Sequence, residues 1–137
     1  MYYDESPETA RRAIEEAERL LPGTPSAPDE NDPRWHAIIQ IGYFIESDAK
    51  EAWEFIARWG GHEQEDLRNA IACCLLEHEL EFHFEQYFPK VEELAARDVR
   101  FADCFTRCWK FGKSELPGNA ERFDALQGAC RQRISNT

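Results

Sequence analysis

The stretch CCLLEHELEFHFEQYF, at positions 73–88, holds two cysteines, two histidines and four glutamates. These residue types suggest a metal centre, and the related HExxH helix places two histidines four residues apart on one face. Here His78 and His83 are five residues apart, so at about 100° per residue their side chains diverge by about 140°. One regular helix would not direct both rings at one zinc ion, and we predict no zinc-protease site.

A second metal site would combine two helices. Cys74 and His78 are four residues apart, and so are Cys104 and Cys108, giving four ligands for a tetrahedral zinc ion. However, zinc-binding cysteines usually lie close together at a turn, and both pairs fall on apolar helix faces. A free cysteine on such a face behaves as a small hydrophobic residue. We therefore favour core packing and predict no metal and no cofactor.

Catalytic motifs are also missing from the sequence. We find no nucleophile elbow, phosphate-binding glycine loop or dinucleotide fingerprint. Cysteine catalysis needs a base beside an accessible thiolate, and sequence spacing pairs none of the four histidines with a cysteine. We therefore predict no catalytic residues and no enzyme activity; a metal-dependent or hydrolytic enzyme built on a helical bundle is the alternative.

The glutamates of the same stretch suggest a binding surface. Glu77, Glu81 and Glu85 recur every four residues and would form an acidic ridge about 12 Å long on one helix face. Such a ridge is typical of a solvated surface, but it would also attract lysine and arginine side chains. Phe84 and Tyr87, if exposed beside it, would supply the aromatic anchor that interfaces favour. These five residues are our predicted partner-binding site.

Charge and composition restrict the classes of partner. The 27 acidic and 16 basic residues give a net charge of −11, which should repel nucleic acids and anionic membranes. Residues 1–66 carry 16 acids and 6 bases, whereas residues 101–137 carry 4 acids and 6 bases. A protein partner selected by charge should therefore be basic. The five cysteines, an odd number without an export signal, indicate a cytoplasmic protein.

The apolar spacing predicts an all-α fold. A hydrophobic content of 42% is sufficient for one packed domain of 137 residues. Capping residues and glycines divide the chain into six or seven antiparallel helices, the fifth with a break near Asp98. The expected ranges are 7–21, 33–46, 49–59, 64–86, 89–111 and 119–133. Residues 22–33, rich in proline, should form a linker after a loosely packed first helix.

The same periodicity predicts the core. Apolar residues recur at i, i+3, i+4 and i+7 in several segments, as on the buried face of a helix. The side chains expected to be buried are Trp35, Ile38, Ile41, Phe55, Ile56, Trp59, Ile71, Cys74, Leu75, Phe101, Phe105 and Trp109.

Residues 65–75, EDLRNAIACCL, hold an acidic residue, an aliphatic–arginine pair, two small residues and a leucine in a characteristic order. The positions are Asp66, Leu67, Arg68, Ala70, Ala72 and Leu75. Over this helix the chain resembles HEAT-like and ARM-type repeat proteins, and residues 33–59 match their helix pairing loosely. The resemblance implies an α–α superhelix built for protein contact. Because no repeat of about 30 to 47 residues is evident, a compact helical bundle is the alternative.

Together these features predict a small, non-catalytic protein-binding module that contacts a basic partner through its helix faces. Small acidic proteins that neutralise basic toxins, as immunity proteins do, are one instance of this class.

Overall fold

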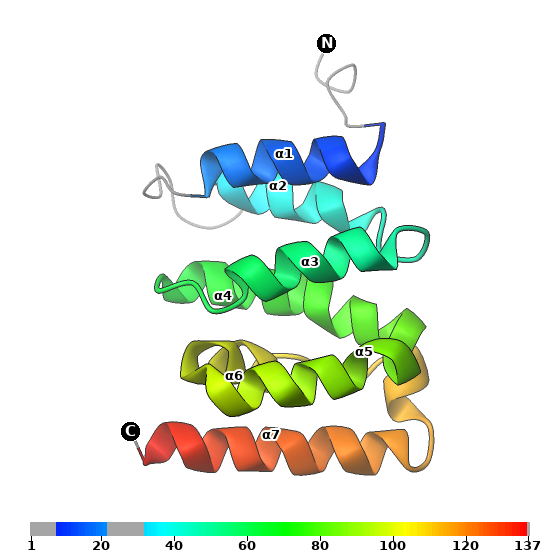
Figure 1. The fold of residues 1–137 in the computed structure, drawn as a ribbon, viewed down its shortest axis with the longest axis vertical. Coiled ribbons are helices and arrows are strands. Elements are labelled where there is room, and N and C mark those ends of the chain that lie inside the picture. Colours follow the sequence, from blue (N-terminus) through cyan, green and yellow to red (C-terminus); the bar gives the residue numbers. More distant parts are fainter. Residues whose placement is uncertain (1–7, 22–31, 137) are drawn as a thin grey trace.

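The computed structural model describes residues 8–21 and 32–136. These residues are helical and form no strand, which confirms the predicted all-α class. Figure 1 shows the helices stacked along the long axis, with successive helices running in alternating directions. The α-helices are α1 (Ala10–Leu20), α2 (Pro33–Gly42), α3 (Ala49–Trp59), α4 (Glu65–Ile71), α5 (Glu77–Arg97), α6 (Val99–Thr106) and α7 (Asn119–Ser135).

Helix starts follow the capping residues in several places. Asp32 caps α2 and accepts a hydrogen bond from the amide of Arg34 at 2.9 Å, with Pro33 at the first helical position. Asp98 caps α6 and accepts from the amides of Arg100 and Phe101 at 3.0 and 3.2 Å. The predicted break near Asp98 is therefore confirmed.

Other boundaries differ from the prediction. Thr9 caps α1, so this helix begins later than the expected residue 7. Residues 1–7 and the first ten residues of the linker, 22–31, lie outside the described residues. Asp48 makes no side-chain capping bond. At α7 the cap is Gly118, with φ of +87°, and Asn119 is the first helical residue.

The largest difference lies between residues 64 and 111, where two helices were expected to meet near Pro89. Instead, α4 passes into one π-helical turn, η3 (Ala72–Leu76), and then into α5, which contains Pro89 and bends at His83. His83 has φ of −136° and ψ of 44°, and its Nε2 atom lies 3.2 Å from the carbonyls of both Ile45 and Glu46. Because carbonyl oxygens only accept, Nε2 must carry the proton. This contact ties the kink to the turn after α2.

The core is built mainly from the side chains predicted for it. Those buried as expected are Ile38, Ile41, Phe55, Ile56, Ile71, Leu75, Phe101 and Phe105. Partly buried are Trp35, Trp59 and Cys74. Aromatic contacts Phe84–Phe88, Phe88–Phe105 and Phe105–Phe123, with ring centroids 4.5, 6.3 and 4.8 Å apart, join α5, α6 and α7.

Trp109 is the exception: the prediction that it is buried is wrong, because 72% of it is exposed. The reason is that α6 ends at Thr106, so Trp109 lies beyond the helical stripe to which the spacing assigned it. The side-chain amide of Gln127 on α7 donates to the carbonyls of Phe105 and Cys108 at 3.0 and 2.9 Å. These bonds satisfy two carbonyls at the end of the helix.

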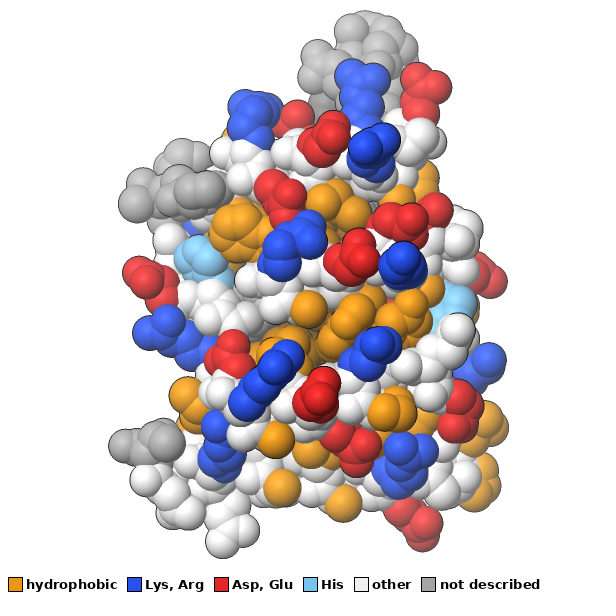
Figure 2. Space-filling view, in the orientation of Figure 1, with side chains coloured by type: hydrophobic (Ala, Val, Ile, Leu, Met, Phe, Trp, Pro, Cys, Tyr) orange, Lys and Arg blue, Asp and Glu red, His pale blue; other side chains and the backbone are white. Residues whose placement is uncertain are grey.

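The surface carries charges of both signs. Figure 2 shows lysine and arginine side chains interspersed with aspartate and glutamate on one face, and hydrophobic side chains in the rows between them. Four of the 27 acidic residues fall outside the described residues, at positions 4, 5, 29 and 30. In the part of the chain that the structure describes, no helix is long and apolar enough to cross a membrane.

Ion pairs join α2, α4 and α6 in series; we call them the Asp–Arg ladder. Arg34 on α2 is 3% exposed, and its Nη2 atom donates to Asp32 at 2.7 Å and to Asp66 on α4 at 2.6 Å. Arg68 on α4 donates from Nε to Asp103 on α6 at 2.8 Å. Hydrogen bonds from Arg68 and Arg107 outweigh burial and leave the pKa of Asp103 below its usual value.

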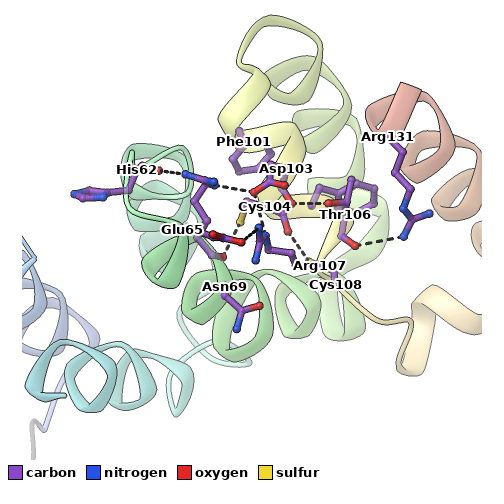
Figure 3. Close-up of polar contacts among 12 residues, drawn as sticks. His62, Glu65, Asn69, Phe101, Asp103, Cys104, Thr106, Arg107, Cys108 and Arg131 are labelled. Carbon is purple, nitrogen blue, oxygen red and sulfur yellow. Dashed lines mark hydrogen bonds and ion pairs between the residues drawn. The ribbon is translucent and has the colours of Figure 1, made fainter. Parts of the chain in front are cut away.

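Figure 3 shows how the ladder continues between α4 and α6. Arg107 extends from the end of α6 toward both Asp103 and Glu65, at 3.0 and 2.9 Å. Nearby, a Cβ at Gly61 would lie 2.5 Å from Oδ2 of Asp98, so a larger residue there would have to displace the Asp98 side chain that caps α6.

Candidate protein-binding surface

The predicted acidic ridge does not form one surface. Glu77 points inward and is buried; its Oε1 atom accepts a hydrogen bond from the amide of Trp109 at 2.9 Å. Burial raises the pKa of Glu77, although this hydrogen bond acts in the opposite direction. Glu81 is partly exposed and Glu85 is exposed, but they lie on opposite sides of the kink at His83. The expected solvent-facing row of three glutamates is therefore wrong.

The π-helical turn η3 explains the error. A π-turn adds one residue to a helical turn, so every later position rotates by about 100° relative to a regular α-helix. Before η3 the apolar positions face inward as predicted, as Leu67 and Ile71 show. After it, Glu77 takes an inward position, whereas His78, placed on the apolar face by the spacing, is partly exposed.

The two predicted aromatic anchors, which lie beyond both the π-turn and the kink at His83, are also inside. Phe84 is fully buried and stacks on Phe88, and Tyr87 is buried against Trp53, with ring centroids 5.8 Å apart. Their expected exposure is therefore wrong. Burial, together with nearby carboxyl groups, chiefly that of Glu79, raises the pKa of Tyr87.

Exposed aromatic side chains occur instead just beyond α6. Trp109 and Phe111 are both exposed, and the amide of Trp109 donates a hydrogen bond to Glu77. The His78 ring stacks on Phe111 with ring centroids 5.7 Å apart. Nδ1 of His78 lies 2.7 Å from Oε1 of Glu81. We call Trp109, Phe111, His78 and Glu81 the aromatic surface. It combines a large exposed indole with a carboxylate, as interface anchors often do.

Sequence reasoning missed this surface because it treated residues 101–111 as one helix. Gly112, with φ of +50°, is consistent with the expected end at residue 111, but α6 already ends at Thr106. The contacts that accompany this earlier end come from Gln127 on α7, so no local sequence signal reveals it.

The cysteines serve as packing residues. Thiol Sγ atoms of Cys104 and Cys108 lie 3.5 and 3.7 Å from the carbonyls of Arg68 and Ala72. Burial raises the pKa of both thiols, and that of Cys74 to about 11, so none is an activated thiolate at neutral pH. Within the described ranges, no group of three or more histidine, cysteine, aspartate or glutamate residues is placed to hold a metal ion.

One buried acid stands apart from these groups. Glu79 is fully buried on α5, and neither carboxyl oxygen has a hydrogen-bond partner among the described residues. Burial raises the pKa of Glu79 to about 9, so the group is a neutral carboxylic acid at pH 7.

No protein-family model, curated protein or solved structure matches this chain.

Proposed function

We propose that this protein is a non-catalytic protein-binding domain and that the aromatic surface is its main contact. The observation that carries the proposal is Trp109, a tryptophan with 72% of its area exposed, on a segment held by buried groups. Exposing so large an apolar side chain has no benefit for folding, whereas tryptophan is enriched at the centres of interfaces. The Glu77 and Gln127 contacts hold its backbone in place before binding, which lowers the entropy lost on association.

The partner that we propose is basic overall. A net charge of −11 favours the approach of a positively charged protein at long range, and Glu81 beside the His78 ring offers a local contact for a lysine or arginine. The exposed glutamate of the predicted ridge, Glu85, lies beyond the kink and adds to the long-range field only. A toxin-neutralising protein of the cytoplasm, with reduced cysteines, would fit this description.

The helix arrangement supports a repeat-like scaffold for this role. Helices α1 and α2, α3 and α4, and α5 and α6 are neighbours in the stack, and the Asp–Arg ladder joins the second helix of each pair to the next. We propose that these pairs stack as HEAT-type repeats do, which leaves extended helix faces available for a partner.

Substitution of Trp109 tests the proposal. Tagged wild-type protein, Trp109→Ala and Tyr43→Ala should be compared in pull-downs followed by mass spectrometry. Tyr43 is the matched control, because it is 73% exposed but lies at the end of α2. We expect Trp109→Ala to lose a partner that the wild type and Tyr43→Ala both retain, with unchanged circular dichroism. Retention of every partner by Trp109→Ala would refute the proposal.

A further inference from the structure

A groove is lined partly by Trp109 but by no other residue of the aromatic surface. It lies between α4, η3, the end of α6 and α7, with a volume of about 440 Å³, within the roughly 300–1,000 Å³ typical of ligand sites. Phe123 and the two cysteines Cys73 and Cys108 provide its apolar lining, and Trp109 stands at its edge.

The charge of this groove is opposite to that of the chain. Three of its lining residues, Arg107, Lys110 and Arg131, are cationic, and none of the residues that line it is acidic. Arg107 pairs with Asp103 and Glu65 outside the lining, and Lys110 pairs with Asp124.

Arg131 is the cation that remains available. Its guanidinium makes one long hydrogen bond, 3.4 Å from Nη2 to the carbonyl of Thr106, and no ion pair with a carboxylate of the described chain. Figure 3 shows this side chain reaching from α7 toward the end of α6. A carboxylate in the groove would therefore meet an arginine whose donors are largely uncommitted, without displacing an existing ion pair.

We propose that this groove binds an extended acidic segment of a protein partner, with a carboxylate on Arg131 and an apolar side chain against Trp109. The inference rests on the proposed function and assigns the local chemistry of the docking segment. A partner that is basic overall can carry such a segment, because net charge governs approach over long distances whereas the groove governs contact. A segment of a partner that is basic overall is favoured over nucleic acid, because a phosphate backbone is anionic along its whole length and the net charge of −11 repels it.

Fluorescence anisotropy with labelled peptides tests this directly. The probe is an eight-residue peptide of alternating aspartate and leucine, and its control replaces each aspartate with asparagine. We expect the acidic peptide to bind at least about tenfold more tightly, and Arg131→Ala to remove about tenfold of that affinity, as loss of one charge-assisted hydrogen bond would. Arg11→Ala on α1, an exposed arginine far along the chain, should leave binding unchanged.

Equal binding of the two peptides, or wild-type affinity in Arg131→Ala, would overturn the inference. Tighter binding of an eight-nucleotide single strand than of the acidic peptide would also overturn it, in favour of a nucleic-acid site. If Arg131→Ala keeps the partner that Trp109→Ala loses, the groove assignment fails while the proposed function stands. Loss of the partner in Arg131→Ala but not in Trp109→Ala would refute the aromatic surface and the apolar contact with Trp109, and would retain only the carboxylate contact with Arg131.

Discussion

At the scale of single residues, Glu79 combines complete burial with a carboxyl group that no described residue satisfies. A carboxyl group normally releases its proton near pH 4, but the folded state holds this one to about pH 9. Between these values the folded state binds a proton that the unfolded state has lost. Folding stability should therefore fall as pH rises across this window and become flat above it.

We expect Glu79→Gln to remove this dependence. The variant should gain stability relative to wild type by up to about 1.4 kcal/mol per pH unit between pH 5 and 9. Urea denaturation at pH 5, 7 and 9 measures the difference, and Glu85→Gln, an exposed glutamate of the same helix, is the control. A constant difference between Glu79→Gln and wild type at all three values would contradict the burial of a protonated acid.

Glu77 should stabilise the fold through the hydrogen bond that it accepts from the amide of Trp109. Glu77→Ala leaves the amide of Trp109 without its acceptor, at an expected cost of about 1–3 kcal/mol in the free energy of unfolding. Glu77→Gln, which keeps an acceptor oxygen, should cost less, and Glu85→Ala should stay within about 0.5 kcal/mol. Chemical denaturation measures all three; equal stability of Glu77→Ala and Glu85→Ala would show that Glu77 faces solvent after all.

How far these roles could be predicted depends on regular helix geometry. Phe55, Ile71 and Phe105 follow an unbroken α-helical period, so their burial was predictable. Glu77 and Phe84 follow a π-turn that has no sequence signature in this chain, and their orientation was therefore predicted wrongly. The exposure of Trp109 was predicted wrongly for another reason. Its helix ends where the side chain of Gln127, far along the sequence, donates hydrogen bonds to the carbonyls of Phe105 and Cys108.

At the scale of helices, part of the Asp–Arg ladder corresponds to a short sequence repeat that helix periodicity does not carry, whereas its acceptor on α6, Asp103, lies outside this repeat. The tripeptides Asp32-Pro-Arg34, Asp66-Leu-Arg68 and Asp98-Val-Arg100 recur at intervals of 34 and 32 residues. Each lies at the start of the second helix of a pair, α2, α4 or α6. Their recurrence can be read from the sequence, but their partners cannot, because the ion pairs join residues more than 30 positions apart.

The tripeptides differ in what their arginines do, and this gives a matched test. Arg34→Ala would leave the buried Asp32 carboxylate unpaired and should cost about 3–5 kcal/mol. Arg100→Ala, an exposed arginine at the corresponding position of α6, should cost less than about 0.5 kcal/mol. Thermal or urea denaturation of both variants measures the contrast. Similar losses of folding stability in the two variants would mean that Arg34 does not form a stabilising buried ion pair with Asp32.

At the scale of the whole molecule, charge acts chiefly on the rate of encounter. On the face shown in Figure 2, surface charges of both signs are interspersed, and we expect the net charge of −11 to act as a long-range field. We expect association with the captured basic partner to slow as salt rises, because exposed charges are screened beyond about 10 Å at 0.1 M, while dissociation changes little. Surface plasmon resonance at several salt concentrations measures both rates. A salt-independent association rate would exclude a partner selected by charge.

Each rung of the Asp–Arg ladder joins an arginine of one layer to an aspartate of the next, as Arg34 joins Asp66 and Arg68 joins Asp103. If a helix pair were duplicated together with its aspartate and arginine, the copy would therefore contain both residue types needed for a new ion pair between layers. Gene duplication, or deliberate design, could lengthen the protein by whole pairs of helices while α1 and α7 stay at its ends. The binding face would then grow in steps of about one helix pair, without a new kind of contact.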